Sequence, residues 1–183
     1  LTGRDLSRKA AKPQPVNKLI PGSGHAILTT QGPGRLTAAI TFGPYGGFHG
    51  HFDKLSFVFF GYGKELGVDP GRAASQAYRL PIHNAWYKAT SGHNAVLVDG
   101  IGQKAATGEL ISSAASESYS VVAADAGPAF ENVQHRRFLL LGPTYLLVAD
   151  RLVSADGKEH TFEWLYHDAG ASYECGMPSV KGE

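Results

Sequence analysis

The chain has 183 residues, enough for one domain with a sizeable core, because a domain of about 150 residues buries roughly 70% of the surface that its unfolded chain exposes. Lys and Arg number 17 against 16 Asp and Glu, and this near balance excludes the large one-sign field expected of a nucleic-acid or membrane-surface binder. A single Cys excludes an intrachain disulfide framework, and no run approaches the roughly 18 apolar residues of a membrane span.

Residues 1–24 are predicted to be a basic linker or arm, since Lys and Arg recur there against one acidic residue, with prolines and glycines nearby. The segment lacks the apolar core of a signal peptide. Because the chain begins with Leu1 rather than Met, we expect it to be processed or excised from a longer chain.

From His25 onward, short apolar runs alternate with Gly and Pro, a pattern typical of antiparallel strands joined by turns. The runs are 25–30, 35–42, 54–60, 95–99, 110–112, 119–124, 136–142, 144–153 and 159–167. The fold class predicted from them is all-β, with an antiparallel β-sandwich over residues 25–183.

Turns and packing residues follow from the same pattern. Residues 61–64 and 141–144 are predicted to be hairpin turns, and residues 78–87 a long loop. In 159–167, alternation places Phe162, Trp164 and Tyr166 on one face, and we expect Phe162, Trp164 and Tyr145 to pack in the core. His160 and His167 are interpreted as ordinary strand residues.

The residues that can carry chemistry gather between 43 and 103. If residues 49–53 are extended, His49, His51 and Asp53 project to one face of a strand. With Asp69 and His93 from neighbouring strands, His51 could complete a three-residue set of the kind that holds a divalent metal. A hydrogen-bonded structural cluster remains the alternative, because spacing alone does not separate the two.

A second His-Asn pair, His83 and Asn84, lies in the predicted loop 78–87. Loops carry ligand contacts more often than strands do, so His83 is a candidate for substrate contact, with local packing as the alternative.

Four pieces in fixed order resemble the heparinase II/III-like polysaccharide lyases. They are residues 49–53 (HGHFD), residues 69–71 (DPG) with Tyr78 beyond them, His93-Asn94, and residues 98–100 (VDG) with Gln103. The resemblance covers about residues 23–168 and implies the C-terminal β-sandwich of that family. The N-terminal α/α toroid that such enzymes also contain is absent from this sequence.

The resemblance also implies roles for individual residues. His49 resembles the catalytic-cleft histidine, and the set His51, Asp69 and His93 resembles the ligands of a bound metal, most commonly zinc. Asp53 would then orient one imidazole through its other ring nitrogen. Further expected contacts with substrate are Tyr45, Arg72, Tyr78, His83 and Asn94.

The implied function is β-elimination on a uronate-containing polysaccharide such as alginate or a glycosaminoglycan, with the metal in a structural role. Since the family draws its acid and base mainly from the toroid, we expect the isolated chain to be inactive. Expected partners are an anionic polysaccharide and the helical toroid, with homo-oligomers open and neither nucleic acid nor membrane involved. The family is bacterial, which implies a periplasmic or secreted location.

Two other functions remain. The chain could be a non-catalytic carbohydrate-binding or domain-packing module, or a metal-dependent hydrolase that uses the same His and Asp residues. A hydrolase would leave a product without the unsaturated uronate, and a non-catalytic module would leave no product at all.

Overall fold

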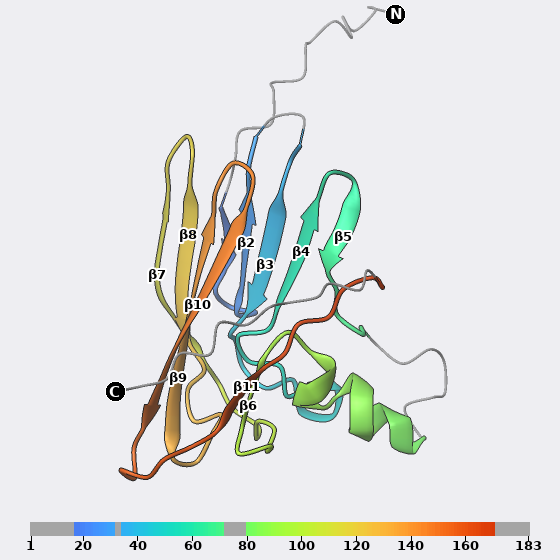
Figure 1. The fold of residues 1–183 in the computed structure, drawn as a ribbon, viewed down its shortest axis with the longest axis vertical. Coiled ribbons are helices and arrows are strands. Elements are labelled where there is room, and N and C mark those ends of the chain that lie inside the picture. The colour runs from blue at the N-terminus through green and yellow to red at the C-terminus, as the bar shows by residue number, and fades with distance from the viewer. Residues whose placement is uncertain (1–16, 32–33, 72–79, 171–183) are drawn as a thin grey trace, which may run out of the picture.

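The computed structural model describes residues 17–31, 34–71 and 80–170, and Figure 1 shows that they form a β-sandwich. One sheet has the antiparallel order β1-β2-β3-β4-β5, and the other has the antiparallel order β10-β9-β8-β7. The first sheet consists of β1 (Lys18–Ile20), β2 (His25–Thr29), β3 (Thr37–Thr41), β4 (Phe57–Gly61) and β5 (Lys64–Gly67). The second consists of β7 (Glu109–Ala115), β8 (Ser120–Asp125), β9 (Val133–Leu141) and β10 (Leu146–Ser154).

A third, two-stranded sheet pairs β6 (Val96–Val98) with β11 (Phe162–Trp164) at the lower end of the sandwich in Figure 1. The all-β antiparallel fold predicted from the sequence is therefore confirmed. Among the described residues, no helix is long and apolar enough to cross a membrane.

The core lies between the two large sheets, because alternate residues of each strand point inward. In β9 the buried positions are every second residue, from Val133 to Leu141. The fully buried apolar side chains include Leu28, Leu36, Ile40, Leu55, Val122, Leu139 and Leu141.

Both predicted hairpin turns are confirmed. β4 and β5 are joined by Tyr62 and Gly63, both with positive φ (54° and 75°), as the tight turn of a two-residue hairpin requires. β9 and β10 are joined at residues 142–145, where the Gly142 N–H donates to the Tyr145 carbonyl at 2.9 Å.

Several local predictions were wrong. Residues 18–20, assigned to the basic arm, pair with β2 as strand β1. The strand predicted over 159–167 is paired only at 162–164, and because it lies outside the main sandwich, Phe162 and Trp164 are 41% and 50% exposed. Tyr145 is 45% exposed rather than in the core.

Residues 83–87, predicted to be part of a loop, form a helical turn with wide, π-type hydrogen bonding.

Candidate functional site

The centre of the candidate site is a pair formed by His93 and Asp69. His93 is completely buried, and its Nδ1 lies 2.6 Å from Oδ2 of Asp69. The other carboxylate oxygen, Oδ1, accepts a hydrogen bond from the Gly71 N–H at 2.8 Å. Gly71 has φ of +64°, a conformation that favours glycine, so the Asp69–Gly71 turn aims the carboxylate at His93.

A close contact between two backbone turns determines the position of His93. It follows a 3₁₀ turn, Thr90–Gly92, which packs against the helical turn His83–Tyr87. A Cβ added to Gly92 would lie 2.4 Å from the Trp86 carbonyl oxygen, so only glycine allows the two turns to approach this closely.

His51 lies beside this pair. The centroid of its ring is 5.3 Å from that of His93 and 6.4 Å from that of His83. Burial and the neighbouring His93 lower the pKa of His51, against the opposing attraction of Asp53 and Asp69. His51 is therefore a neutral imidazole at neutral pH.

The pKa of Asp69 is also shifted. Burial acts to raise it, but the hydrogen bond from His93 and the charge interaction with that ring outweigh burial, and the pKa of Asp69 lies below its ordinary value. The carboxylate is ionised, which is the form that binds a cation.

Asp69 thus contacts His93, and the His51 ring lies beside the His93 ring, although the three residues come from distant parts of the chain. Nε2 of His93 is buried and has no hydrogen-bond partner within the described part of the chain. A buried ring nitrogen without a partner suits a group that is completed by a ligand. As placed, the side chains of residues 17–31, 34–71 and 80–170 do not gather into a full metal-coordination set.

His49 does not share a strand face with His51. Residues 47–49 form a 3₁₀ turn, and His49 is exposed at its end with its ring 5.2 Å from that of Phe48. Glycines cause the difference, since Gly47 has φ of +61° and a Cβ on Gly50 would lie 2.6 Å from the backbone nitrogen of Gly46. A strand over 49–53 was therefore a wrong prediction.

Asp53 has a different neighbour from the one expected. Its carboxylate contacts Nζ of Lys54 at 3.3 Å, whereas the carboxylate that holds an imidazole here belongs to Asp69.

Asn94, expected to contact substrate, is used entirely inside the fold. Its side-chain nitrogen donates to the carbonyls of Phe57 and Val68 at 2.8 and 3.0 Å, and its side-chain oxygen accepts from the His167 N–H at 2.6 Å. The residue is 0% exposed. Asn94 therefore ties β4, the residue after β5 and the segment after β11 together, and the prediction that it contacts substrate is corrected.

Of the other expected contact residues, the structure describes Tyr45 and His83. Tyr45 stacks on Phe52 at 5.5 Å, with Nζ of Lys88 5.5 Å from the Tyr45 ring centroid. His83 is half-buried, with its Nδ1 buried and unpartnered in the described structure. Arg72 and Tyr78 lie outside the described residues.

A buried charged network supports the site, and the sequence reasoning missed it. Arg137 is the largest fully buried side chain, and it binds both oxygens of Asp150, through Nε at 2.8 Å and Nη2 at 2.9 Å. His135 approaches the same carboxylate at 2.6 Å. His135 and Arg137 are buried because they alternate in phase with Val133, Leu139 and Leu141 on the inner face of β9.

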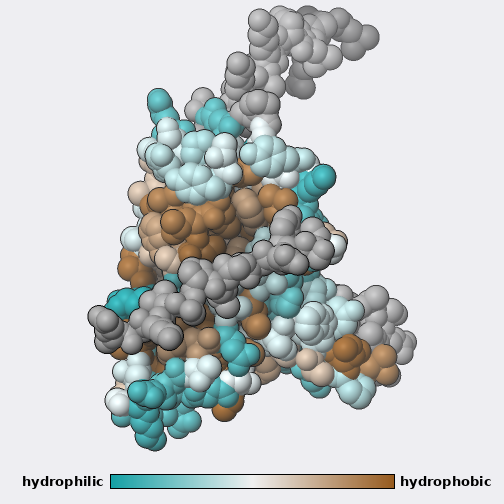
Figure 2. Space-filling model, viewed as in Figure 1, coloured by the Kyte–Doolittle hydropathy of each residue, from teal (hydrophilic) through white to brown (hydrophobic). Residues whose placement is uncertain are grey.

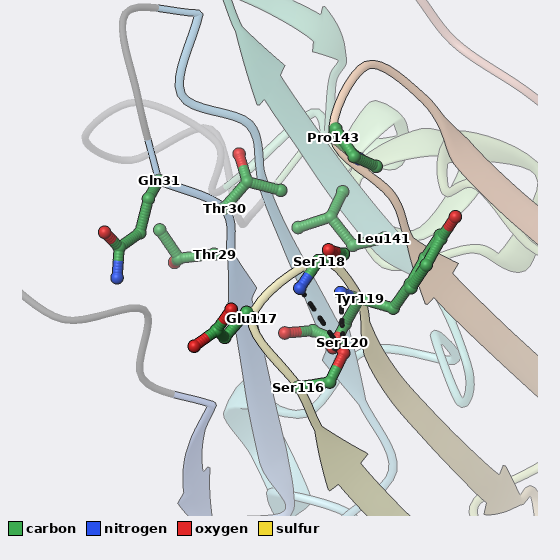
Figure 3. A pocket seen from close by; sticks show the side chains of 10 residues that line it. All are labelled: Thr29, Thr30, Gln31, Ser116, Glu117, Ser118, Tyr119, Ser120, Leu141 and Pro143. Carbon is green, nitrogen blue, oxygen red and sulfur yellow. Dashed lines mark hydrogen bonds between the residues drawn. The ribbon is translucent and has the colours of Figure 1, made fainter.

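A separate cavity of about 260 Å³ lies among the loops at the other end of the sandwich, and Figure 3 shows its side chains. Most of its polar residues carry hydroxyls, and Oγ of Ser116 accepts from the N–H groups of Ser118 and Tyr119. The lining residues are Thr29, Thr30, Gln31, Ser116, Glu117, Ser118, Tyr119, Ser120, Leu141 and Pro143. None is an imidazole, so this cavity is separate from the histidine cluster.

Comparisons with known proteins agree on one family. The family model described as heparinase II/III-like, C-terminal, matches residues 12–179. An exo-oligoalginate lyase of Saccharophagus degradans is 30% identical over 135 residues, which cover 63% of this chain and 18% of that protein.

Solved structures share the fold. Heparan sulfate lyase HepC from Pedobacter heparinus is 20% identical with a TM-score of 0.69, and the match covers 80% of this chain and 23% of that one. A heparinase III gives a TM-score of 0.69 at 21% identity, with the same coverage. The chain therefore spans less than a quarter of the length of these relatives.

Proposed function

The chain belongs to the heparinase II/III-like C-terminal family, and from this premise we propose that it is the β-sandwich part of a lyase that cleaves a uronate-containing polysaccharide by β-elimination. The observation that carries the proposal is the meeting of His51, Asp69 and His93 at one end of the sandwich. The likeness to an exo-oligoalginate lyase supports an anionic, alginate-like or glycosaminoglycan-like substrate.

A divalent metal, with zinc the first candidate, would be held by His51, Asp69 and His93. The donor types fit, since zinc takes imidazole nitrogen and carboxylate oxygen. The protonation states fit as well, because the lowered pKa values of His51 and Asp69 leave both in the form that binds a cation. When bound, such an ion would supply a fixed positive charge that holds this wall of the cleft in place.

The reaction removes a proton beside the uronate carboxylate, breaks the bond to the departing glycosidic oxygen and returns a proton to that oxygen. His49 is exposed at the end of its turn, where an imidazole can accept or give a proton near neutral pH. Tyr45 and His83 would contact the sugar beside it. The remaining acid and base would come from a helical domain of a longer enzyme, because the matched relatives are several times longer than this chain.

A non-catalytic carbohydrate-binding module is the second candidate, and one observation favours it. Trp164 stacks on Tyr166 with ring centroids 5.8 Å apart and 10° between their planes, and Trp164 is half-exposed. A flat, exposed aromatic pair of this kind can bind the face of a sugar ring.

The deciding experiment measures unsaturated uronate products from alginate and from glycosaminoglycans, with the isolated chain and with the chain joined to its helical domain. Elimination by the longer protein, together with loss of activity in His49→Ala, supports the lyase. Binding of oligosaccharide by both proteins without any unsaturated product supports the module instead. A lyase acting on extracellular polysaccharide would work in the periplasm or outside the cell, and fractionation of the producing cells tests that location.

A further inference from the structure

His160 lies between two carboxylates in the loop that joins β10 to β11. Its Nδ1 is 2.6 Å from Oδ2 of Asp99, and its Nε2 is 3.1 Å from Oδ1 of Asp156. Only 9% of the His160 side chain is exposed. A neutral imidazole has a proton on one nitrogen and a lone pair on the other, so it can donate to only one of the two carboxylates. The contacts of both ring nitrogens therefore require the charged, doubly protonated ring.

Each carboxylate is held by a turn of its own. Asp99 and Gly100 form the tight turn that follows β6, with φ of 53° and 71°. Oδ1 of Asp156 accepts hydrogen bonds from the Lys158 N–H at 3.1 Å and from the Ser154 hydroxyl at 3.0 Å. The charged imidazole thus joins two fixed turns from distant parts of the chain.

The start of β11 depends on the same carboxylate. The Thr161 N–H donates to Oδ1 of Asp99 at 2.8 Å, and the Asp99 N–H donates to the Thr161 carbonyl at 2.8 Å. Beyond these bonds, β11 pairs with β6 over only three residues, and a two-stranded sheet is marginally stable by itself. Contacts at the end of this short ladder therefore weigh heavily in holding β11 in place.

The charges around His160 favour its protonated form. Hydrogen bonds to Asp99 and Asp156 raise the pKa of His160 above its ordinary value of 6.5, against the opposing effect of burial. Figure 2 shows hydrophilic side chains gathered at this end of the molecule, over the loop between β10 and β11. The other charged groups nearby are Lys104 and Glu131, which line a cavity of about 250 Å³ with His160, and Lys158, Glu159 and Glu163.

We propose that Asp99, His160 and Asp156 form a pH-sensitive latch, which holds β11 against β6 while the imidazole is protonated and releases β11 when the proton is lost. Loss of the proton leaves a nitrogen lone pair facing a carboxylate, so one of the two contacts must open. The stability that the latch contributes is fully present below pH 6.5, the unfolded-state pKa. It is lost as pH rises through the higher pKa of the folded state.

Release of β11 would reach the rest of the site. Nε1 of Trp164 in β11 donates to Oδ2 of Asp150 at 3.1 Å, and the His167 N–H donates to Oδ1 of Asn94, the residue after His93. Both contacts would loosen with the strand. The latch itself does not depend on the lyase activity, so either proposal can fail without the other.

Two measurements on the unaltered chain test the latch. Histidine ring signals in NMR spectra give the pKa of His160, whose signal is identified by its loss in His160→Gln. Amide hydrogen exchange, corrected for the intrinsic rate at each pH, gives the protection of the Thr161 and Leu165 N–H groups, which bond to Asp99 and to the Ala95 carbonyl.

The two results must agree in size. The midpoint of His160 should lie above 6.5, and for each pH unit of that difference the protection should fall about ten-fold across the titration, because the ring of the released strand has its ordinary pKa. A midpoint at or below 6.5, or protection that stays constant while His160 titrates, would overturn the proposal.

Variants identify the group responsible. His160→Gln keeps an N–H donor but does not titrate, so the protection of Thr161 should no longer fall with rising pH. His25→Gln is the matched control, since His25 contacts Thr41 within the first sheet at 3.2 Å, and the fall should persist there. A fall that persists in His160→Gln, or disappears in His25→Gln, would refute the latch. Should His160→Gln fail to fold, Asp156→Asn decides, because it should lower the midpoint of His160 toward 6.5, and an unchanged midpoint would count against the proposal.

Discussion

The guanidinium of Arg137 binds both carboxylate oxygens of Asp150, and its remaining nitrogen, Nη1, donates to the backbone carbonyls of Leu55 and Asn94 at 2.7 and 2.6 Å. Asn94 directly follows His93, and Leu55 lies four residues after His51. A single buried ion pair therefore fixes the two segments that carry the imidazoles of the site.

Asp150→Asn should destabilise the fold by about 3–5 kcal/mol, because it leaves the Arg137 charge buried without a counter-charge. Urea unfolding followed by circular dichroism measures the change. Arg136→Gln is the matched control, since Arg136 pairs with Asp125 from a side chain that is 44% exposed. That control should cost no more than about 1 kcal/mol. Equal losses of unfolding free energy in the two variants would show that the buried Arg137–Asp150 pair contributes no more than the exposed pair does.

Acid should unfold the chain in a defined range. Burial acts to raise the pKa of Asp150, but the hydrogen bonds from His135 and Arg137 hold it at about 2, below its ordinary value of 3.8. The stability from this depressed pKa is full above the unfolded-state value and is lost as pH falls toward the folded value. Urea midpoints between pH 5 and pH 2 should therefore fall for the wild type and much less for Asp150→Asn. If the urea midpoints of the two proteins fell in parallel with pH, the lowered pKa of Asp150 would not be the cause of the acid sensitivity.

His51 should titrate below the ordinary value of 6.5, because burial and His93 disfavour its charged form. The stability that the neutral His51 ring contributes is therefore fully present above pH 6.5, its unfolded-state pKa. It is lost as pH falls through the lower pKa of the folded state. Histidine ring signals in NMR spectra between pH 4 and 8 measure this directly. A midpoint at or above 6.5 would refute the assigned burial effect.

His51→Ala and His49→Ala should differ in kind. Loss of His51 removes a proposed ligand, so zinc content measured by elemental analysis should drop well below that of the wild type, and the added stability from zinc should vanish. His49→Ala should leave both unchanged, since the exposed side chain belongs to no proposed ligand set. In the longer lyase that we propose, His49→Ala should lower the elimination rate by roughly 10² to 10⁴. Equal zinc content in both variants would exclude the His51 ligand.

Asn94→Ala should destabilise the fold by roughly 2–4 kcal/mol, because three hydrogen bonds of a fully buried side chain disappear and leave their backbone partners unpaired. Thermal and urea unfolding measure the loss. Asn84→Ala is the control, since Asn84 is exposed in its helical turn and should change stability by no more than about 0.5 kcal/mol. A stable Asn94→Ala variant would mean that these bonds are replaced by water.

The fold could be predicted from the sequence because short apolar runs between turn residues are a local signal, as in 136–142 and 144–153, which are separated at Gly142 and Pro143 and form β9 and β10. The members of the histidine cluster were also predictable, through a family pattern. Their geometry was not, because Gly47 and Gly50 make a turn where His49 and His51 suggested a strand. The burial of Asn94 depends on carbonyls 26 and 37 residues away, which no local pattern contains.

The same long-range ties govern when the site can form during folding. Arg137 meets Leu55 across 82 positions and Asn94 across 43. Contacts of such sequence separation form slowly, because the intervening chain must close before they stabilise anything. The histidine segments therefore gain their link through Arg137 only after β9 has joined the sandwich, and a nascent chain that stops short of residue 137 lacks that link.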